Sequence, residues 1–268
     1  MSIITISRGS YSKGKEIAER VAQELGYDCI AREVLLEASE EFNIPEIKLD
    51  RSIYDAPSFL ERLSCGKEKY ISFIQATILN HLQRDNIVYH GLAGHFFVKG
   101  ISHVLKVQII TDLEVRIKIV MDRDKISRED ALLFIENIDN ERRNWSKRLY
   151  GIETWDASLY DLIIHIHNTI DDAVDIICKT ARSKDFQTTP ESQKAIDDLA
   201  LAAQVKAALM DVKIDIRVSA RDGVVFVQTD GSLLQEQPLA RNIEKIVSKI
   251  PGVKDIKTKV IPFSPYGE

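Results

Sequence analysis

The sequence predicts an α/β protein in which a doubly wound parallel sheet is followed by a small α+β domain. Three observations lead to this prediction. Apolar runs of strand length alternate with helical patterns over the first two thirds of the chain, which is typical of a parallel sheet. A polar, proline-marked stretch without periodicity then interrupts the pattern at residues 184–192. Beyond it, a shorter pattern of helix, hairpin, helix and strand follows.

The composition is that of an ordinary globular protein. Of the 268 residues, 44% are hydrophobic and 29% are charged, which is enough for a sizeable core and argues against disorder. The formal net charge is −5 and the basic residues are interleaved with acids, so we expect no nucleic-acid partner. Neither a signal peptide nor a membrane span is recognisable, and we expect a cytoplasmic protein. Cys29, Cys65 and Cys178 are odd in number and far apart, which fits reduced thiols.

A glycine-containing loop separates the first predicted strand from the first predicted helix. The run Ile3 to Ile6 predicts a strand that ends near Ser7, and apolar residues then recur at helical spacing until Gly26. Between them the chain reads GSYSKGKE. Glycines allow backbone N–H groups to turn toward phosphate oxygens, and a lysine reaches the outer phosphates. The residues predicted to bind phosphates are Gly9, Ser10, Ser12, Lys13, Gly14, Lys15 and Glu16.

Glu16 departs from the usual pattern of such a loop. That position ordinarily carries a Ser or Thr hydroxyl that contacts a magnesium ion. The alternative interpretation is a strand-to-helix turn with an exposed lysine and no phosphate-binding role.

The alternation of elements continues to about residue 183. Strands are predicted at residues 87–89, 104–110 and 162–166 because each is a short apolar run. Helices are predicted over residues 33–42, within 59–84, after a Thr111–Glu114 capping box, after a Ser127 cap, and over 171–180.

Histidines lie near two of these strands. His90, Gly91 and His95 follow the strand at 87–89, where the loops of a parallel sheet face the ligand crevice, so we predict that they contact a substrate. His165 and His167 alternate on a strand and would suit a metal, but no third ligand is recognisable. We therefore predict no metal ligands.

The segment from residue 116 to residue 148 contains six arginines. Asp139 precedes Arg142 by three residues, so on a helix both side chains share one face, and the acid can orient the arginine. The planar guanidinium group neutralises the charge of a transferring phosphoryl group. The alternative is a solvated helix with surface ion pairs.

Several of these motifs together resemble the cytidylate kinase-like family of P-loop nucleotide kinases over residues 1–183. They are Thr5-Ile6-Ser7-Arg8, the loop through Lys15-Glu16-Ile17-Ala18, the strand that ends near Gly91, the run Arg116-Ile117-Lys118, and Asp139-x-x-Arg142. The resemblance implies a P-loop kinase fold, with ATP and Mg²⁺ as cofactors and a nucleotide as the small-molecule substrate.

The resemblance also implies roles for particular residues. The implied catalytic residues are Lys15, Arg116, Arg123, Asp139 and Arg142, and Arg143 joins the histidine loop as a substrate-binding residue. The family usually has an arginine after the glycine at position 91, whereas this chain has Leu92, so the identity of the acceptor stays open.

Residues 193–263 resemble a BON domain, joined by a linker at 184–192 and followed by a tail at 264–268. The resemblance rests on VKAAL, the RDGVV turn and the ending IPGVKDIKTKV. BON domains are associated with phospholipid or envelope surfaces, but the charges here are nearly balanced. We expect a regulatory, ligand-binding or oligomerising module, with membrane contact as the alternative.

Three functions remain open at this point. The first is ATP-dependent phosphoryl transfer to a CMP-like nucleotide or a related small phosphate acceptor. The second is a P-loop sensor that binds nucleotides with little turnover. The third is an envelope-associated scaffold that acts through its BON-like domain.

Overall fold

The computed structural model describes residues 1–31, 34, 37, 38, 40, 42, 67–91, 94–166, 169–231 and 236–262. Contacts between Cα atoms divide the chain into two compact units. The first comprises residues 1–62 and 84–189, and the second comprises residues 63–83 and 190–268. Cys65, Leu92, His167, the tail at 264–268 and half of the predicted helix at 33–42 lie outside the described residues.

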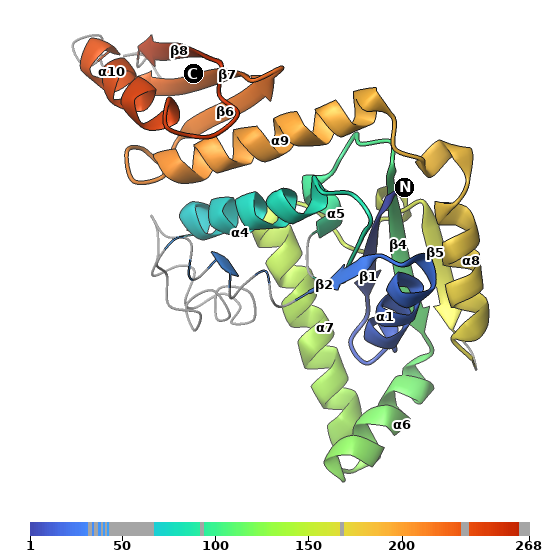
Figure 1. The fold of residues 1–268 in the computed structure, drawn as a ribbon. Helices are drawn as coiled ribbons and strands as arrows, with labels where there is room; N and C mark the ends of the chain where they lie inside the picture. The colour runs from blue at the N-terminus through green and yellow to red at the C-terminus, as the bar shows by residue number, and fades with distance from the viewer. Residues whose placement is uncertain are drawn as a thin grey trace. The chain divides into compact units, whose positions relative to one another are not determined.

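The first unit contains a five-stranded parallel sheet, which confirms the predicted α/β class (Figure 1). The strands lie in the order β2-β3-β1-β4-β5. Their bounds are Ile3–Arg8 (β1), Asp28–Ile30 (β2), Ile87–Tyr89 (β3), Val104–Thr111 (β4) and Leu162–Ile166 (β5). β1 is central, with β3 on one side and β4 on the other. The strand order therefore reverses at β1, and such a switch point is where open α/β sheets bind ligands.

Five α-helices of the first unit are described. They are α1 (Gly14–Leu25), α5 (Gly94–Phe97), α6 (Leu113–Asp124), α7 (Arg128–Tyr150) and α8 (Asp171–Ala181). The predicted cap of α7 is confirmed, because Ser127 accepts a hydrogen bond from the backbone N–H of Asp130 at 3.1 Å. The predicted capping box of α6 is wrong. Its N-cap is Asp112, whose side chain makes no capping bond to the helix, and the Thr111 hydroxyl donates instead to the carbonyl of Ser12 at 3.3 Å.

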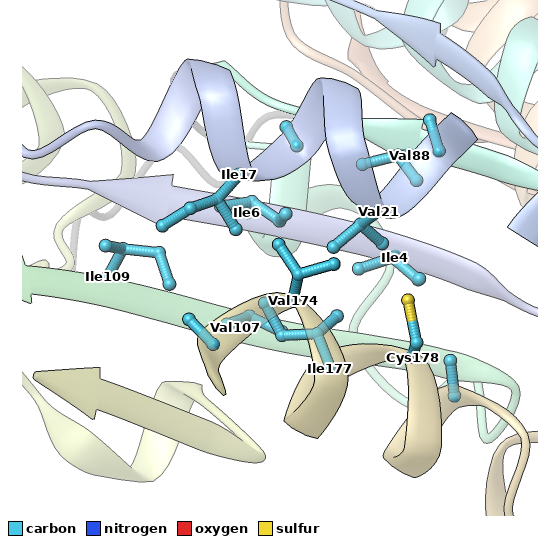
Figure 2. Packing of buried hydrophobic residues seen from close by; sticks show 14 of the residues in the cluster. Ile4, Ile6, Ile17, Val21, Val88, Val107, Ile109, Val174, Ile177 and Cys178 are labelled. Carbon is cyan, nitrogen blue, oxygen red and sulfur yellow. The ribbon is translucent and has the colours of Figure 1, made fainter. Parts of the chain in front are cut away.

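The core between the sheet, α1 and α8 anchors both ends of the loop that follows β1. Ile4 and Ile6 of β1 pack with Ile17 of α1 and with Ile177 of α8, all almost completely buried (Figure 2). Each such side chain contributes about 1.5–3 kcal/mol by its removal from water. Cys178 lies in the same cluster, and burial raises the pKa of its thiol to about 11, so the group stays protonated at neutral pH.

Helices α6 and α7 form a hairpin with a small core of its own. Ile117 and Val120 of α6 are buried against Ala131 and Ile135 of α7. Tyr11, from the loop between β1 and α1, packs against this cluster. The hairpin and the loop are therefore in direct contact.

The second unit has the order helix, hairpin, helix, strand that the sequence predicts. Its elements are α9 (Pro190–Leu209), β6 (Ile216–Arg221), β7 (Val224–Gly231), α10 (Glu236–Val247) and β8 (Asp255–Pro262). β6 and β7 are antiparallel, whereas β7 and β8 are parallel, so the sheet is mixed. α9 begins at Pro190, inside the segment that the sequence suggests is a linker.

A helix from the middle of the chain belongs to the second unit. α4 (Lys67–Leu82) lies along α9, and Gln193 Nε2 donates to the carbonyl of Gln83 at 2.8 Å (Figure 1). The sequence places this helix within the first domain, because nothing local marks its packing partner. No helix in the described part of the chain has an apolar stretch long enough to cross a bilayer.

Candidate active site

The loop at residues 9–13 leaves the end of β1 and enters α1 through two left-handed residues. Tyr11 and Lys13 both have φ of 58°. The Ser12 hydroxyl donates to the carbonyl of Gly9 at 2.9 Å and so closes the loop on itself. Lys13 is the N-cap of α1 and makes no side-chain capping bond. The first-turn N–H groups of α1 therefore have no side-chain cap, which suits an anion at this position.

Gly14 has a steric reason to lack a side chain. A Cβ atom at this position would lie 2.5 Å from Cδ of Arg8 and 2.8 Å from its Cβ. At Gly9 the nearest atoms would be those of the Arg116 guanidinium group, at 3.8 Å. Only the second of the two glycines is thus required by packing.

Ser10, Arg116 and Asp139 form a buried polar cluster, which we call the Ser10 clamp. The guanidinium group of Arg116 donates to the Ser10 carbonyl at 2.7 Å, to the Ser10 hydroxyl at 2.6 Å and to Asp139 Oδ2 at 2.6 Å. The Ser10 hydroxyl donates to Asp139 Oδ1 at 2.7 Å. Ser10 and Arg116 are 2% and 7% exposed. Charge-assisted bonds of this length hold the loop firmly against α6 and α7.

Asp139 and Arg142 of α7 both contact residues at the start of the loop. Arg142 Nη1 lies 3.3 Å from the carbonyl of Arg8, to which it donates. The sequence suggests that Asp139 orients Arg142. In the structure the carboxylate binds Arg116 and Ser10, which lie far from it in the sequence.

Arg123 contacts the same loop through an aromatic stack. Its guanidinium carbon lies 4.6 Å from the ring centroid of Tyr11 and 5.9 Å from that of Phe134. Two hydrogen bonds to Asp124, at 2.6 and 2.5 Å, raise the pKa of Arg123 and lower that of the Asp124 carboxyl. Tyr11 was not among the predicted site residues, although an aromatic residue between the two loop glycines is itself a signal.

Lys15 and Glu16 lie in the first turn of α1 and are exposed. Lys15 Nζ is 3.6 Å from Glu19 Oε1, and the lysine side chain is 65% exposed. An exposed pair one helical turn apart contributes little stability. The amine can therefore leave Glu19 for a stronger anion at small energetic cost.

The segment after β3 is held by packing against Tyr89. A Cβ on Gly91 would lie 2.5 Å from the Tyr89 hydroxyl oxygen, and one on Gly94 would overlap the tyrosine ring. His90 is buried, and its backbone N–H donates to the carbonyl of Ile30 at 3.0 Å. Residues 94–97 form the short helix α5, where the sequence predicts only a loop from residue 90 to residue 94.

His95 of α5 is buried and is linked to the end of β1 through Tyr160. His95 Nε2 is 3.4 Å from the Tyr160 hydroxyl oxygen, and that hydroxyl lies 3.3 Å from Ser7 Oγ and 3.0 Å from the carbonyl of Thr154. Burial, and secondarily the charge of Lys106, lowers the pKa of His95 to about 4. The imidazole is therefore neutral at physiological pH. Sequence spacing gives no indication of the Tyr160 partner.

The structure brings only part of the predicted site together. Gly9, the Ser10 clamp and Arg142 meet at the loop, and Arg123 reaches it through Tyr11. Arg143 is exposed on α7, and no contact among the described residues joins it to the loop or to the clamp. His165 binds Asp112 at 2.9 Å, and the described residues contain no group of three or more metal-ligating side chains.

Comparisons with known proteins match this part of the chain. The model of the cytidylate kinase-like family matches residues 3–168. The cytidylate kinase of Sulfolobus acidocaldarius is 23% identical over 187 residues, which are 69% of this chain and 97% of the relative. The cytidylate kinase of Ignicoccus hospitalis is 26% identical over 168 residues, which are 62% of this chain and 90% of the relative. A crystal structure of an uncharacterized protein from Eubacterium ventriosum has the same fold, with a TM-score of 0.52 at 21% identity over 68% of this chain and 99% of that chain.

Proposed function

The chain belongs to the cytidylate kinase-like family, and on this basis we propose that it transfers the γ-phosphoryl group of ATP to a CMP-like nucleotide or a related small phosphate acceptor. The observation that carries the proposal is the Ser10 clamp. The clamp holds the loop before α1, whose first-turn N–H groups have no side-chain cap, beside the arginine-bearing helices α6 and α7. Phosphoryl transfer depends mainly on positioning and on neutralising the charge of the transferring group, and both need such an arrangement.

The loop residues fit the phosphates of ATP. The first-turn N–H groups of α1 offer donors, and the helix dipole adds partial positive charge at the same end. Lys15 exchanges its weak partner Glu19 for the outer phosphates. Gly9, Ser12, Lys13 and Gly14 shape the backbone between these donors.

The residues present fit a magnesium ion that is held mainly by phosphates and water. Such an ion neutralises phosphate charge and orients the transferring group. Position 16 offers a carboxylate in place of a hydroxyl, and Glu16 is exposed in the first turn of α1. Glu16 would therefore contact water molecules that are bound to the ion.

The arginines divide into two roles. Arg116 is a positioning residue, because its guanidinium group is engaged by Ser10 and Asp139. Arg142 and Arg123 supply positive charge to the reacting phosphates from α7 and α6. Asp139 acts through Arg116 and Ser10 and does not itself contact the substrate.

The acceptor binds beyond the ends of β1 and β3. His90, Gly91 and His95 come from the segment after β3, and Arg143 approaches from α7. Since His95 is neutral, it recognises the acceptor by a hydrogen bond and not by charge.

We assign residues 1–183 to the kinase domain, residues 184–192 to the linker and residues 193–263 to a BON-like module with a regulatory or ligand-binding role. The order of its elements and the RDGVV and IPGVKDIKTKV motifs support this assignment.

A nucleotide sensor with little turnover is the second candidate function. Two sequence features favour it, namely the absence of a hydroxyl at position 16 and Leu92 in place of the arginine that the family usually has after Gly91.

An acceptor screen tests the proposal. Full-length protein with ATP, Mg²⁺ and each of CMP, dCMP, UMP and AMP should form ADP only in the presence of the correct acceptor. Lys15→Ala should lower this rate by about two orders of magnitude or more, whereas Lys179→Ala, an exposed lysine on α8, should not change it.

The alternatives give other results. If calorimetry detects ATP binding that depends on Lys15 and no acceptor stimulates ADP formation, the protein is a sensor. The absence of any heat on addition of ATP would contradict both functions.

A further inference from the structure

One face of the C-terminal sheet is covered and the other is open. Ile216, Val225 and Val227 point to the covered face, where they form a core with residues of α9 and α10. Because side chains alternate along a strand, their neighbours point to the opposite face. Phe226 lies there and is 40% exposed, which makes it the one exposed large hydrophobic residue among the described residues of this unit.

Basic side chains surround Phe226 on this open face. In the sheet register, Phe226 lies opposite Ser219 and Lys257, and Gln228 lies opposite Arg217 and Lys259. Lys257 Nζ is 5.5 Å from the centroid of the Phe226 ring. Arg221 occupies the end of β6 on the same face. We call Arg217, Arg221, Phe226, Gln228, Lys257 and Lys259 the Phe226 face.

The positive charge continues beside β8. Arg241 and Lys245 of α10, with Lys254, line a groove of about 750 Å³ that also contains Glu244 and Asp255. Residues 236–262 contain six lysines or arginines and three acids, although the whole chain has a net charge of −5. Two acids lie on the Phe226 face itself. Asp255 shares the face of Lys257 on β8. Asp230 approaches Arg217 at 3.6 Å, but both side chains are largely exposed, so the pair is weak and the four basic residues outnumber the two acids.

We propose that the Phe226 face binds single-stranded nucleic acid. Each base has an aromatic face that stacks on a ring such as Phe226, while lysine and arginine side chains spaced along the strands meet the phosphates. This inference rests on the proposed binding role of the C-terminal module and not on the kinase activity. It revises the expectation of no nucleic-acid partner. That expectation rested on the distribution of charge along the sequence, whereas the basic residues of the Phe226 face come together only when the three strands pair.

The shape of the face favours a single strand over the other polyanions. The face of this three-stranded sheet is wider than the two-stranded ribbon that enters the major groove of a duplex. A bilayer partner needs several apolar side chains that project past the cations. Here a single ring lies among the cations, with a lysine above it.

Fluorescence anisotropy with full-length protein tests the proposal. Fluorescein-labelled dT₁₂ and U₁₂ should bind at low salt, and the affinity should fall steeply as salt is raised. Lys257→Glu/Lys259→Glu should weaken binding at least tenfold. The charge-matched control Lys99→Glu/Lys179→Glu, on exposed lysines of the first unit, should change it less than threefold.

Substitutions of Phe226 separate stacking from simple apolar contact. Phe226→Tyr should retain binding, whereas Phe226→Leu should weaken it about fivefold or more, because leucine cannot stack on a base. Binding that is equally strong in Phe226→Leu would overturn the proposal.

Two further results would also overturn it. One is the absence of oligonucleotide binding at low salt. The other is co-sedimentation with vesicles of anionic phospholipid that depends on Lys257 and Lys259 and persists in Phe226→Leu. The acceptor-dependent formation of ADP, measured on the same variants, should be unchanged. The nucleic-acid proposal can therefore fail without any effect on the proposed kinase activity, and the reverse also holds.

Discussion

Two segments follow the central strands of the parallel sheet, and they are held by different forces. The loop after β1 is held by charged and polar groups, because Arg116 and Asp139 reach Ser10 from α6 and α7. The segment after β3 is held by aromatic packing, because Gly91 and Gly94 fit against the Tyr89 ring.

The difference shows how one sheet edge can provide two kinds of subsite. A loop held by charges keeps its position while backbone donors stay available to an anion. A segment held by packing offers a fixed wall with neutral polar groups, such as His95. The two segments should therefore respond differently to the removal of charge, to pH and to added volume.

The largest expected effect comes from breaking the Ser10 clamp. Arg116→Ala leaves the Asp139 carboxylate buried without its cation, which should lower the free energy of unfolding by about 3–5 kcal/mol. Urea denaturation measures this change. The double variant Arg116→Ala/Asp139→Ala should be less destabilised than the sum of the single variants. Additive effects would mean that the loop after β1 does not depend on the pair.

Acid should destabilise the segment after β3. The folded-state pKa of His95 is about 4, below its ordinary value of 6.5, so between these values the unfolded chain binds a proton that the folded chain does not. The free energy of unfolding should therefore fall by about 3 kcal/mol as the pH falls from 6.5 to 4. The stabilisation that comes from the neutral His95 side chain is fully present above pH 6.5. Chemical denaturation across this window measures it.

His95→Gln should remove most of this pH dependence. An identical slope in His95→Gln and the natural protein would refute the assignment.

Added volume should affect the two segments unequally. Gly94→Ala places a methyl group into the Tyr89 ring and should lower the free energy of unfolding by about 1–3 kcal/mol. Gly9→Ala, in the loop after β1, meets its nearest atoms at 3.8 Å and should change stability by less than about 1 kcal/mol. Thermal melting compares the two. Equal losses would show that the glycines are not distinguished by packing.

The smallest expected effect concerns the stack of Arg123 on Tyr11. Arg123 is about half exposed, so Arg123→Ala should lower the free energy of unfolding by about 0.5–1 kcal/mol. Tyr11→Phe keeps the ring but removes the hydroxyl, which also interacts with Arg123, and should retain part of this coupling, whereas Tyr11→Leu should remove it. A double-mutant cycle between positions 123 and 11 measures the coupling, and a value near zero would count against the stack.

The architecture was largely predictable because its signals are local. Apolar runs and helical periods identified β1, α1, β4 and the C-terminal elements, and Gly26, with φ of 71°, ends α1 as predicted. β2 was not predicted, because its sequence Asp28-Cys29-Ile30 is not an apolar run, whereas the equally short β3 reads Ile87-Val88-Tyr89. α5 was missed because it has a single turn.

The site was less predictable because its contacts span long stretches of the sequence. Ser10 lies 106 residues before Arg116 and 129 before Asp139, so helical spacing suggested Arg142 as the partner of Asp139. The same limit applies to Thr111, whose hydroxyl binds the Ser12 carbonyl instead of capping α6. The sequence suggested that helix α4 belongs to the first domain, because no residue pattern near α4 indicates that it packs against the distant helix α9.

The distance along the chain between Ser10 and Asp139 bears on when the proposed site becomes complete during synthesis. A nascent chain that ends before residue 139 already contains β1, β3 and β4, yet lacks the carboxylate that secures Ser10. We therefore expect that a ribosome-bound chain does not form the proposed nucleotide site until α7 has emerged and docked, even though the glycines of the loop are made well before that helix.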